Sequence, residues 1–258
     1  MFKKFLFIPF IIFAAFPLFA DSKNLVYSNT FDFVDIDCVE ISLVYENLQV
    51  SRIYGDEIVV EIGSNNIKKV PEVSVDDYRL KIISKEEKVR LGDKCTVYIY
   101  LPQDFNAQEI TINNVSGNIS ADILEAQNGV LINNVSGRTD INACKTELFT
   151  AISVSGNITL QKINADYFEL ASTSGNIFAQ LEQASLATSQ ITNISGKTQL
   201  YYPKASDFEI TAFTISGSIK DNSSNKTNTG ISYHKTIGSG GSQLSITSVS
   251  GKVELVEF

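Results

Sequence analysis

Apolar and polar residues alternate with a period of two along most of this chain, and in the second half the alternation restarts about every 20 residues. Ile110 and Ile112 show the pattern before one restart, and Ile119 and Ala121 show it afterwards. This alternation predicts β-strands with one buried face, and no helical period competes with it. The sequence therefore predicts an all-β fold.

A Ser-Gly pair marks each restart of the pattern. Seven Ser-Gly pairs mark these restarts, and their successive glycines are 20, 19, 19, 21, 21 and 34 residues apart. A fixed period of this length is typical of a solenoid, in which each repeat forms one coil stacked on the coil before it. We therefore predict a single-stranded β-helix, or β-solenoid, with coils of about 20 residues. The pairs are Ser116-Gly117, Ser136-Gly137, Ser155-Gly156, Ser174-Gly175, Ser195-Gly196, Ser216-Gly217 and Ser250-Gly251.

Each repeat has the pattern strand, corner, strand around its glycine. A glycine at a fixed corner position is explained by a positive φ or by a close approach of two chain segments, and the serine beside it can bond to neighbouring backbone. The residue three positions before the glycine is always small and polar. This position suits a corner that satisfies backbone groups or a polar stripe that faces a ligand. The residues are Asn114, Asn134, Ser153, Ser172, Asn193, Thr214 and Ser248.

The start of the chain has the features of a targeting segment. Lys3 and Lys4 precede an apolar run that ends at Phe19, and the small residue Ala20 follows. Residues 1–20 are therefore predicted to be a secretory signal peptide, with an uncleaved membrane anchor as the alternative. We expect an exported protein, located in the periplasm, on the outer surface or in the medium, with no membrane insertion after cleavage.

The rest of the chain is expected to have two parts. Residues 21–109 are rich in strands but lack the Ser-Gly mark, so they form a β cap or an irregular continuation of the stack. Residues 110–258 form the solenoid, with an insertion at 221–243 that includes an extra strand at 231–237. Because the open end of a β-stack promotes aggregation, we expect this insertion to cover it.

The net charge limits the possible partners, and the cysteines limit the possible redox chemistry. The net charge is −8, or −10 once Lys3 and Lys4 are removed, which disfavours nucleic acid and anionic lipid as partners. Cys38, Cys95 and Cys144 are too far apart for a CxxC motif. In an oxidising compartment Cys38 and Cys95 can form a disulfide, and two buried free thiols are the alternative. Cys144 occupies an apolar inward position of its coil.

The sequence carries no recognisable catalytic, metal or cofactor motif. His234 is the single histidine, so a histidine metal cluster and a Ser-His-Asp triad are not supported, and we expect no cofactor. Some β-helices cleave acidic polysaccharides with clustered carboxylates. The acids of this half do not share one offset within the repeat. They are Asp122, Asp140, Glu169, Asp207 and Glu209.

Three classes of function remain at this stage. The first is an adhesin or surface binding module that binds a glycan or a protein with a flat sheet face. Exposed aromatic residues such as Tyr201 and Tyr202 can contribute to such a face. The alternative is that both tyrosines pack at a coil edge. The second is a structural protein of the cell envelope that assembles with itself or with partners. The third is a lyase-like enzyme. We favour the first and expect no catalysis.

The residues also resemble a known family. The segment Cys95 to Pro102 leads into Glu109 to Ile119, repeated corners of the type Val-Ser-Gly-Asn-Ile follow, and a Gly-rich step precedes a last Ser-Val-Ser-Gly-Lys-Val-Glu-Leu. This order is similar to the bacterial adhesin-like family catalogued as domain of unknown function 4097, from about Asn24 onward. The resemblance implies an all-β, helix-like stack of strands in an exported protein, and it brings no catalytic residues to transfer.

Overall fold

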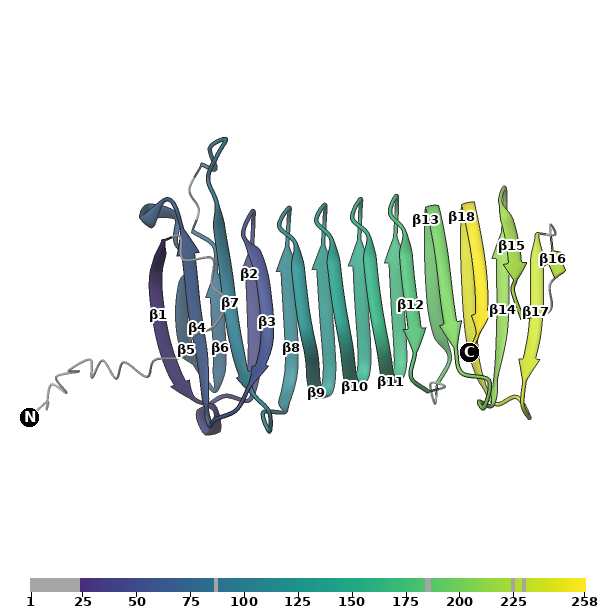
Figure 1. Cartoon of the computed structure of the whole chain (residues 1–258), viewed down its shortest axis with the longest axis horizontal. Coiled ribbons are helices and arrows are strands. Elements are labelled where there is room, and N and C mark those ends of the chain that lie inside the picture. Colours follow the sequence, from purple (N-terminus) through teal and green to yellow (C-terminus); the bar gives the residue numbers. More distant parts are fainter. Residues whose placement is uncertain (1–23, 86–87, 184–186, 224–225, 229–230) are drawn as a thin grey trace, which may run out of the picture.

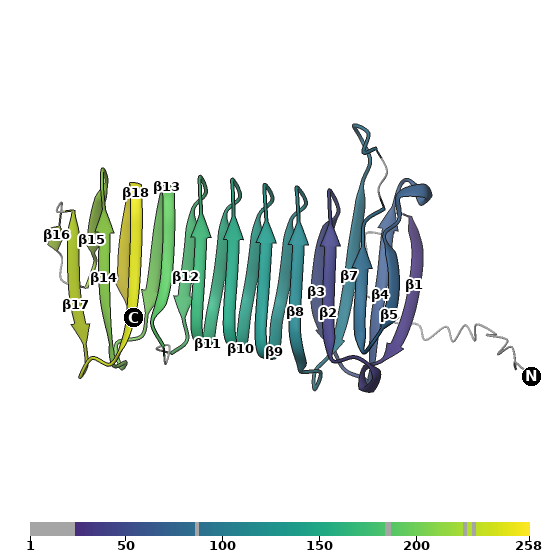
Figure 2. The same ribbon diagram turned by 180° about the vertical axis from the view of Figure 1, so that it is seen from behind.

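The computed structural model describes residues 24–85, 88–183, 187–223, 226–228 and 231–258, and the expected signal peptide lies outside these ranges. Within them, eighteen strands form one sheet, and two short 3-10 helices interrupt it. Figures 1 and 2 show the sheet wound into a long stack of coils with two facing walls. The predicted all-β solenoid is confirmed. No helix in the described part of the chain is both long and apolar enough to cross a membrane.

Wall A denotes the strands that lead into the Ser-Gly corners, and wall B the strands that leave them. Wall A alone contains β2 (Cys38–Leu43), β5 (Glu72–Asp76), β6 (Arg79–Ile83), β8 (Ala107–Asn114), β14 (Phe208–Thr214) and β17 (Ser232–Ile237). Wall B alone contains β1 (Leu25–Asp32), β3 (Asn47–Ile53), β4 (Glu57–Ser64), β7 (Cys95–Pro102), β12 (Ile177–Leu181), β15 (Ser218–Asp221) and β16 (Lys226–Asn228). Five strands run through both walls: β9 (Ile119–Asn134), β10 (Thr139–Ser153), β11 (Ile158–Ser172), β13 (Ser189–Tyr202) and β18 (Ser242–Glu257). The 3-10 helices are η1 (Phe33–Asp35) and η2 (Ile67–Lys69).

The space between the walls is filled by the inward residues of the alternation. Ile112, Phe149 and Phe168 are each at most 1 % exposed, and one hydrophobic cluster runs from the N-terminal region to the last strands. The expected boundary between residues 109 and 110 falls inside β8, and β2 and β3 form a coil of the same stack. The region before residue 110 therefore shares the solenoid's core.

The coils are joined by parallel pairing, and antiparallel strands occur at both ends. Wall A runs β5, β6, β2, β8, β9, β10, β11, β13, β18, β14, β17. Wall B runs β1, β4, β7, β3, β9, β10, β11, β12, β13, β18, β15, β16. The extra strand expected at 231–237 is β17, which forms the last strand of wall A.

The position of β18 differs from the expectation that each coil stacks on the one before it in sequence. β18 lies between β13 and the pair β14 and β15, and it is parallel to both neighbours. Figure 1 accordingly marks the C-terminus within the row of strands rather than at its end. The 34-residue interval before Gly251 arises because the chain builds the outer coil and the end strands before it returns to this slot.

Close approach of stacked corners explains the fixed glycines. A Cβ atom added to any of the seven would lie 1.7–2.3 Å from the carbonyl oxygen of the adjacent corner. Of these glycines, Gly196 is the one in the left-handed region, with φ of 139°. The corner therefore requires glycine because there is no room for a side chain, and a positive φ is the exception.

The small polar residues before the glycines are buried, and in the first five repeats their side chains bond to the corner backbone. The hydroxyls of Thr214 and Ser248, in contrast, have no hydrogen-bond partner among the described residues. Asn134 accepts a hydrogen bond from the Gly137 N–H at 3.2 Å and donates to the Gly117 carbonyl at 3.3 Å. Ser153 accepts from the Gly156 N–H at 2.9 Å. Because these side chains face the interior, the structure supports the interpretation of a self-satisfied corner over a stripe that faces a ligand.

Glu46 ends the ladder of corners at the N-terminal side. It occupies the glycine position of its coil, and its carboxylate accepts from the N–H groups of Val44 and Tyr45 at 2.9 and 3.0 Å. In the next coil the equivalent N–H groups of Val115 and Ser116 donate to carbonyls of the preceding corner. β6 and β7 lie on that side of β2 and β3, but no Ser-Gly corner joins them. Glu46 thus supplies the acceptor that a neighbouring corner would provide, and it is fully buried.

The disulfide considered between Cys38 and Cys95 is not formed. All three cysteines are free thiols. Cys38 is half-buried in wall A, whereas Cys95 is buried in the core of wall B. Burial raises the pKa of Cys95 to about 12, and it also raises the pKa of Cys144 above its usual value. Both buried thiols are therefore unreactive core residues near neutral pH.

Replacement of Gly156 by alanine should destabilise the stack by about 3 kcal/mol, because its Cβ would lie 1.8 Å from the Gly137 carbonyl oxygen. Urea unfolding followed by circular dichroism measures this loss. Ser155→Ala is the matched control, because it removes an exposed hydroxyl whose bond to the Val135 carbonyl is 3.4 Å long. Equal stability of the two variants would contradict the close-approach explanation.

Candidate binding face

The described residues do not form a catalytic or metal centre of the kinds considered. No group of three or more His, Cys, Asp or Glu side chains among them is arranged to hold a metal ion. His234 lies on the outer side of wall A, with Nδ1 3.3 Å from the Thr211 hydroxyl. The acids are dispersed: Asp122 and Asp140 stand in wall B, whereas Glu169 and Glu209 stand in wall A.

The densest polar cluster closes the C-terminal end of the stack. Lys235 Nζ lies 2.9 Å from the Tyr202 hydroxyl and 3.0 Å from the Glu257 carboxylate. It also lies 2.6 Å from the Ser223 hydroxyl, and Asp221, which is 2 % exposed, accepts from Tyr233. The cluster joins β17 of wall A to strands of wall B.

This end cluster is not arranged for nucleophilic catalysis. Burial alone would lower the pKa of Lys235, but its hydrogen bonds to Tyr202 and Glu257 outweigh that effect and raise the pKa above its usual value. A protonated lysine cannot accept the proton of Ser223, so the pair does not form a Ser-Lys nucleophile. The cluster instead satisfies polar groups where the stack ends.

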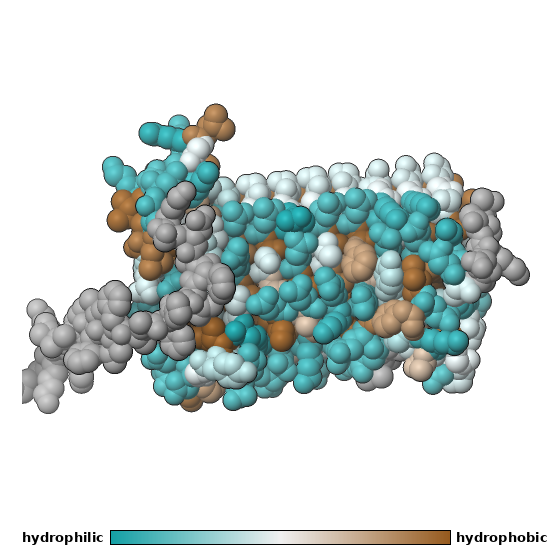
Figure 3. Space-filling model, viewed as in Figure 1, coloured by the Kyte–Doolittle hydropathy of each residue, from teal (hydrophilic) through white to brown (hydrophobic). Residues whose placement is uncertain are grey.

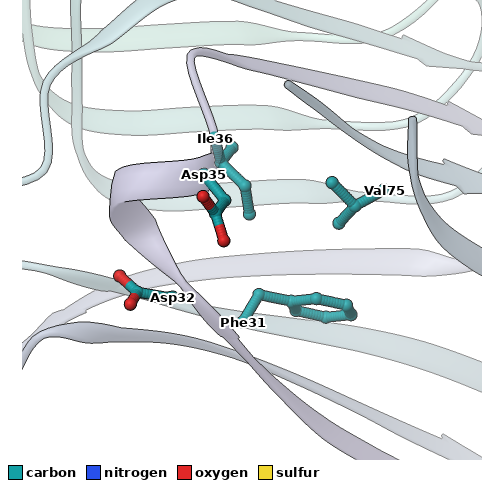
Figure 4. Close-up of a pocket in the computed structure, with 5 residues that line it drawn as sticks. All are labelled: Phe31, Asp32, Asp35, Ile36 and Val75. Atoms are coloured by element: carbon teal, nitrogen blue, oxygen red, sulfur yellow. The ribbon is translucent and has the colours of Figure 1, made fainter. Parts of the chain in front are cut away.

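A small hollow at the N-terminal end also lacks the features of a ligand site. Figure 4 shows the side chains that line it: Phe31, Asp32, Asp35, Ile36 and Val75. Its volume is about 130 Å³, whereas ligand sites usually enclose 300 Å³ or more. Asp32 is already engaged, because it accepts from the Val34 N–H at 3.1 Å and so caps η1.

The outer surface is mostly polar, with isolated apolar groups. Figure 3 shows a teal wall with a few brown patches and a pale row along the upper edge, where Figure 1 places the Ser-Gly corners. One aliphatic residue stands before each serine on that edge in most coils, and these side chains are 37–62 % exposed. They are Val115, Val135, Val154, Ile194, Ile215 and Val249. This row is narrow because the neighbouring corner residues are serine and glycine.

An aromatic pair on wall B is the best candidate for a binding face. Phe178 of β12 and Tyr201 of β13 point outward, and each is half-buried. Their ring centroids are 5.1 Å apart, with 38° between the ring planes. Tyr201 is in register with Gln180, and Phe178 is in register with Gln199. The rings therefore stand diagonally across two strands, beside amide side chains that can donate and accept hydrogen bonds.

A charged group borders this face. Glu254 of β18 is in register with Gln199, accepts from its amide at 3.1 Å and pairs with Lys197 at 2.7 Å. Hydrogen bonds from Lys197 and Lys252 lower the pKa of Glu254 to about 2. The carboxylate is thus ionised between two lysines, so this edge of the aromatic face carries an excess of one positive charge.

The structure divides the two tyrosines that the sequence placed together. Tyr201 lies on the outer face, whereas Tyr202 is fully buried and packs edge-on against Phe208 at 5.7 Å. Phe178 did not emerge as a site residue from the sequence. Its outward position in the alternation of Ile177, Phe178 and Ala179 was the available signal, since a large aromatic residue at a solvent-facing position is uncommon.

Comparison with known protein families identifies the family of this chain. The sequence model of the Toastrack DUF4097 family matches residues 36–193. A comparison with curated proteins finds no match.

Several solved structures align with most of the sequence. A candidate lipid-binding protein from Parabacteroides distasonis is 13 % identical with a TM-score of 0.46, over 91 % of this chain and 98 % of that chain. A candidate adhesin from Bacteroides fragilis is 16 % identical with a TM-score of 0.44, over 91 % and 98 %. A candidate cell-adhesion protein from Clostridium sporogenes is 13 % identical with a TM-score of 0.39, over 90 % and 99 %. Similarity at this level assigns no ligand.

Replacement of Glu254 by glutamine should lower the stability at pH 7, with a difference that disappears in acid. The folded-state pKa of about 2 lies below the ordinary value of 4.5, so the carboxylate stabilises the fold above pH 4.5 and loses this effect as the pH falls toward 2. Urea unfolding of both proteins at pH 7, 4 and 2.5 measures the difference.

Asp122→Asn, which changes an exposed acid on the same wall, is the control for a general effect of charge. A difference between wild type and Glu254→Gln that stays constant from pH 7 to pH 2.5 would contradict the ionic role of Glu254.

Proposed function

This chain belongs to the Toastrack DUF4097 family, and from that premise we propose that it is an exported, non-catalytic adhesin-type module that binds a cell-surface glycan with the outer face of wall B. The observation that carries the proposal is the pair of Phe178 and Tyr201, which stands outward on a flat sheet beside Gln180 and Gln199. The signal-peptide pattern of residues 1–20 supports export.

The chemistry of the face suits a carbohydrate. An aromatic ring offers a flat apolar surface on which the C–H face of a sugar can lie, and the amide groups can bond to hydroxyls at its edge. The two rings extend over neighbouring coils, so an elongated oligosaccharide can meet both. The net charge of −8 favours a neutral ligand over an anionic one.

The rigidity of the stack supports binding by this face. Phe178 and Tyr201 lie on strands whose inward neighbours Ile177, Ala179 and Leu200 are at most 1 % exposed. The rings are therefore held in place before the ligand arrives, and little side-chain freedom remains to be lost on binding. A flat, preorganised face of this kind suits repeated weak contacts along a polymer better than the enclosure of a small molecule.

Replacement of Phe178 or Tyr201 by alanine should weaken glycan binding at least tenfold, which corresponds to about 1.4 kcal/mol. Glycan-array binding of the wild type identifies the ligand, and calorimetry then measures each variant. Because the two rings touch, the double variant should lose less than the sum of the single losses.

Phe213→Ala is the matched control, because Phe213 is an aromatic residue that is 41 % exposed on wall A. The proposal fails if the wild type binds no glycan, or if Phe213→Ala reduces binding while the wall B variants bind normally.

A further inference from the structure

The C-terminal strand occupies an interior slot of the stack. β18 pairs with β13 over the whole span from Ser189–Leu244 to Tyr202–Glu257, and on its other side it pairs with β14 and β15. Leu244, Ile246 and Val253 are at most 2 % exposed. The last strand in the sequence is therefore held as firmly as a central one.

The two coils beside β18 have the spacing of direct neighbours. Gly196 and Gly217 are 21 residues apart, which equals the preceding interval between Gly175 and Gly196. Gly217 now stacks on the carbonyl of Gly251, and Gly251 stacks on that of Gly196. The three corners present the same surfaces to one another, so the stack can form with or without a strand in the slot.

The slot is selective for a strand of this type. A residue other than glycine at position 251 would place its Cβ 2.1 Å from the Gly196 carbonyl oxygen. The strand also supplies a carboxylate opposite Gln199 and within reach of Lys197, as Glu254 does at 2.7 Å from the lysine. A second copy of this chain carries both features at the correct spacing.

The connection to β18 can act as a hinge. The segment from Gly238 to Gly241 precedes the strand, and Gly238, Gly240 and Gly241 have φ of 59°, 77° and 133°. Glycine adopts these angles without steric cost and retains wide conformational freedom. The hinge therefore allows β18 to leave in a direction other than that of its own slot.

We infer that β18 is an exchangeable strand, and that the slot between β13 and β14 accepts β18 from a second copy of this chain. The contacts are the same within one chain and between two, so exchange costs only the association of two molecules and becomes favourable as concentration rises. Reciprocal exchange produces a dimer. The exchanged contacts do not include the aromatic pair of wall B, so that face stays free for a ligand.

A disulfide across the slot tests exchange. Thr192 of β13 and Thr247 of β18 are in register in wall A, on its outer side. Two single variants, Thr192→Cys and Thr247→Cys, are made in a Cys38→Ser background so that the half-buried native thiol does not interfere. The two proteins are denatured together, refolded at increasing concentration, oxidised and separated without reductant.

Exchange should produce a covalent dimer of the two variants. A tenfold rise in concentration should raise the ratio of dimer to monomer by up to about tenfold. The double variant, with both cysteines in one chain, should form a cross-linked monomer when it is dilute. Variants that are folded separately and then mixed should give little dimer, because β18 is buried once it is folded.

Ile152→Cys replaces Thr192→Cys as the control for random encounter, because Ile152 is exposed on wall A but is in register with β9 and β11 rather than β18. The inference is overturned if the Thr192 and Thr247 variants stay monomeric at every concentration while the double variant cross-links within its chain. It is equally overturned if the Ile152 variant forms as much dimer.

Discussion

The structure depends on the close contact between one corner and the next. Each corner glycine lies so near the adjacent corner that an added Cβ would be 1.7–2.3 Å from a carbonyl oxygen. At this distance the corner N–H groups reach the carbonyls of the coil before them, as Ser136 does to Val115 at 2.9 Å. The strands on both sides of the corner are thereby brought into parallel pairing, and the inward residues stack into one core.

A stack of this kind must satisfy its backbone groups at both ends and inside every corner. Within the corners, Asn134 and Ser153 bond to the glycine N–H groups. Where the row of Ser-Gly corners stops, Glu46 supplies a carboxylate in place of a neighbouring corner, and at the C-terminal end Lys235 joins Tyr202 and Glu257 between the walls. Polar side chains thus satisfy the backbone where the regular corners stop and where the stack ends.

In each repeat, the residues that stabilise the fold are distinct from the residues that are available for binding. Inward positions are committed to the core, and outward positions are free to vary, which is how Phe178 and Tyr201 can stand together on wall B. The proposed glycan contact uses this outer face, whereas the proposed strand exchange uses the slot of β18. Glu254 lies on β18 in the slot, and its partner Lys197 lies on β13 next to the aromatic face. Removal of β18 from the slot would therefore change the charges at the edge of that face.

The sequence by itself determined the local structure: the period, the corners, the inward residues and the extra strand at 231–237 all follow from alternation and turn chemistry, which act over short distances. It treated Tyr201 and Tyr202 alike, and the structure separated them into an outward and a buried residue. Only the tertiary structure decided the order of the coils, the role of Glu46, the pairing of Phe178 with Tyr201 and the separation of Cys38 from Cys95. Every corner is compatible with every other corner, so the repeat does not encode which coil lies beside which, and that choice depends on how the whole chain closes its two ends.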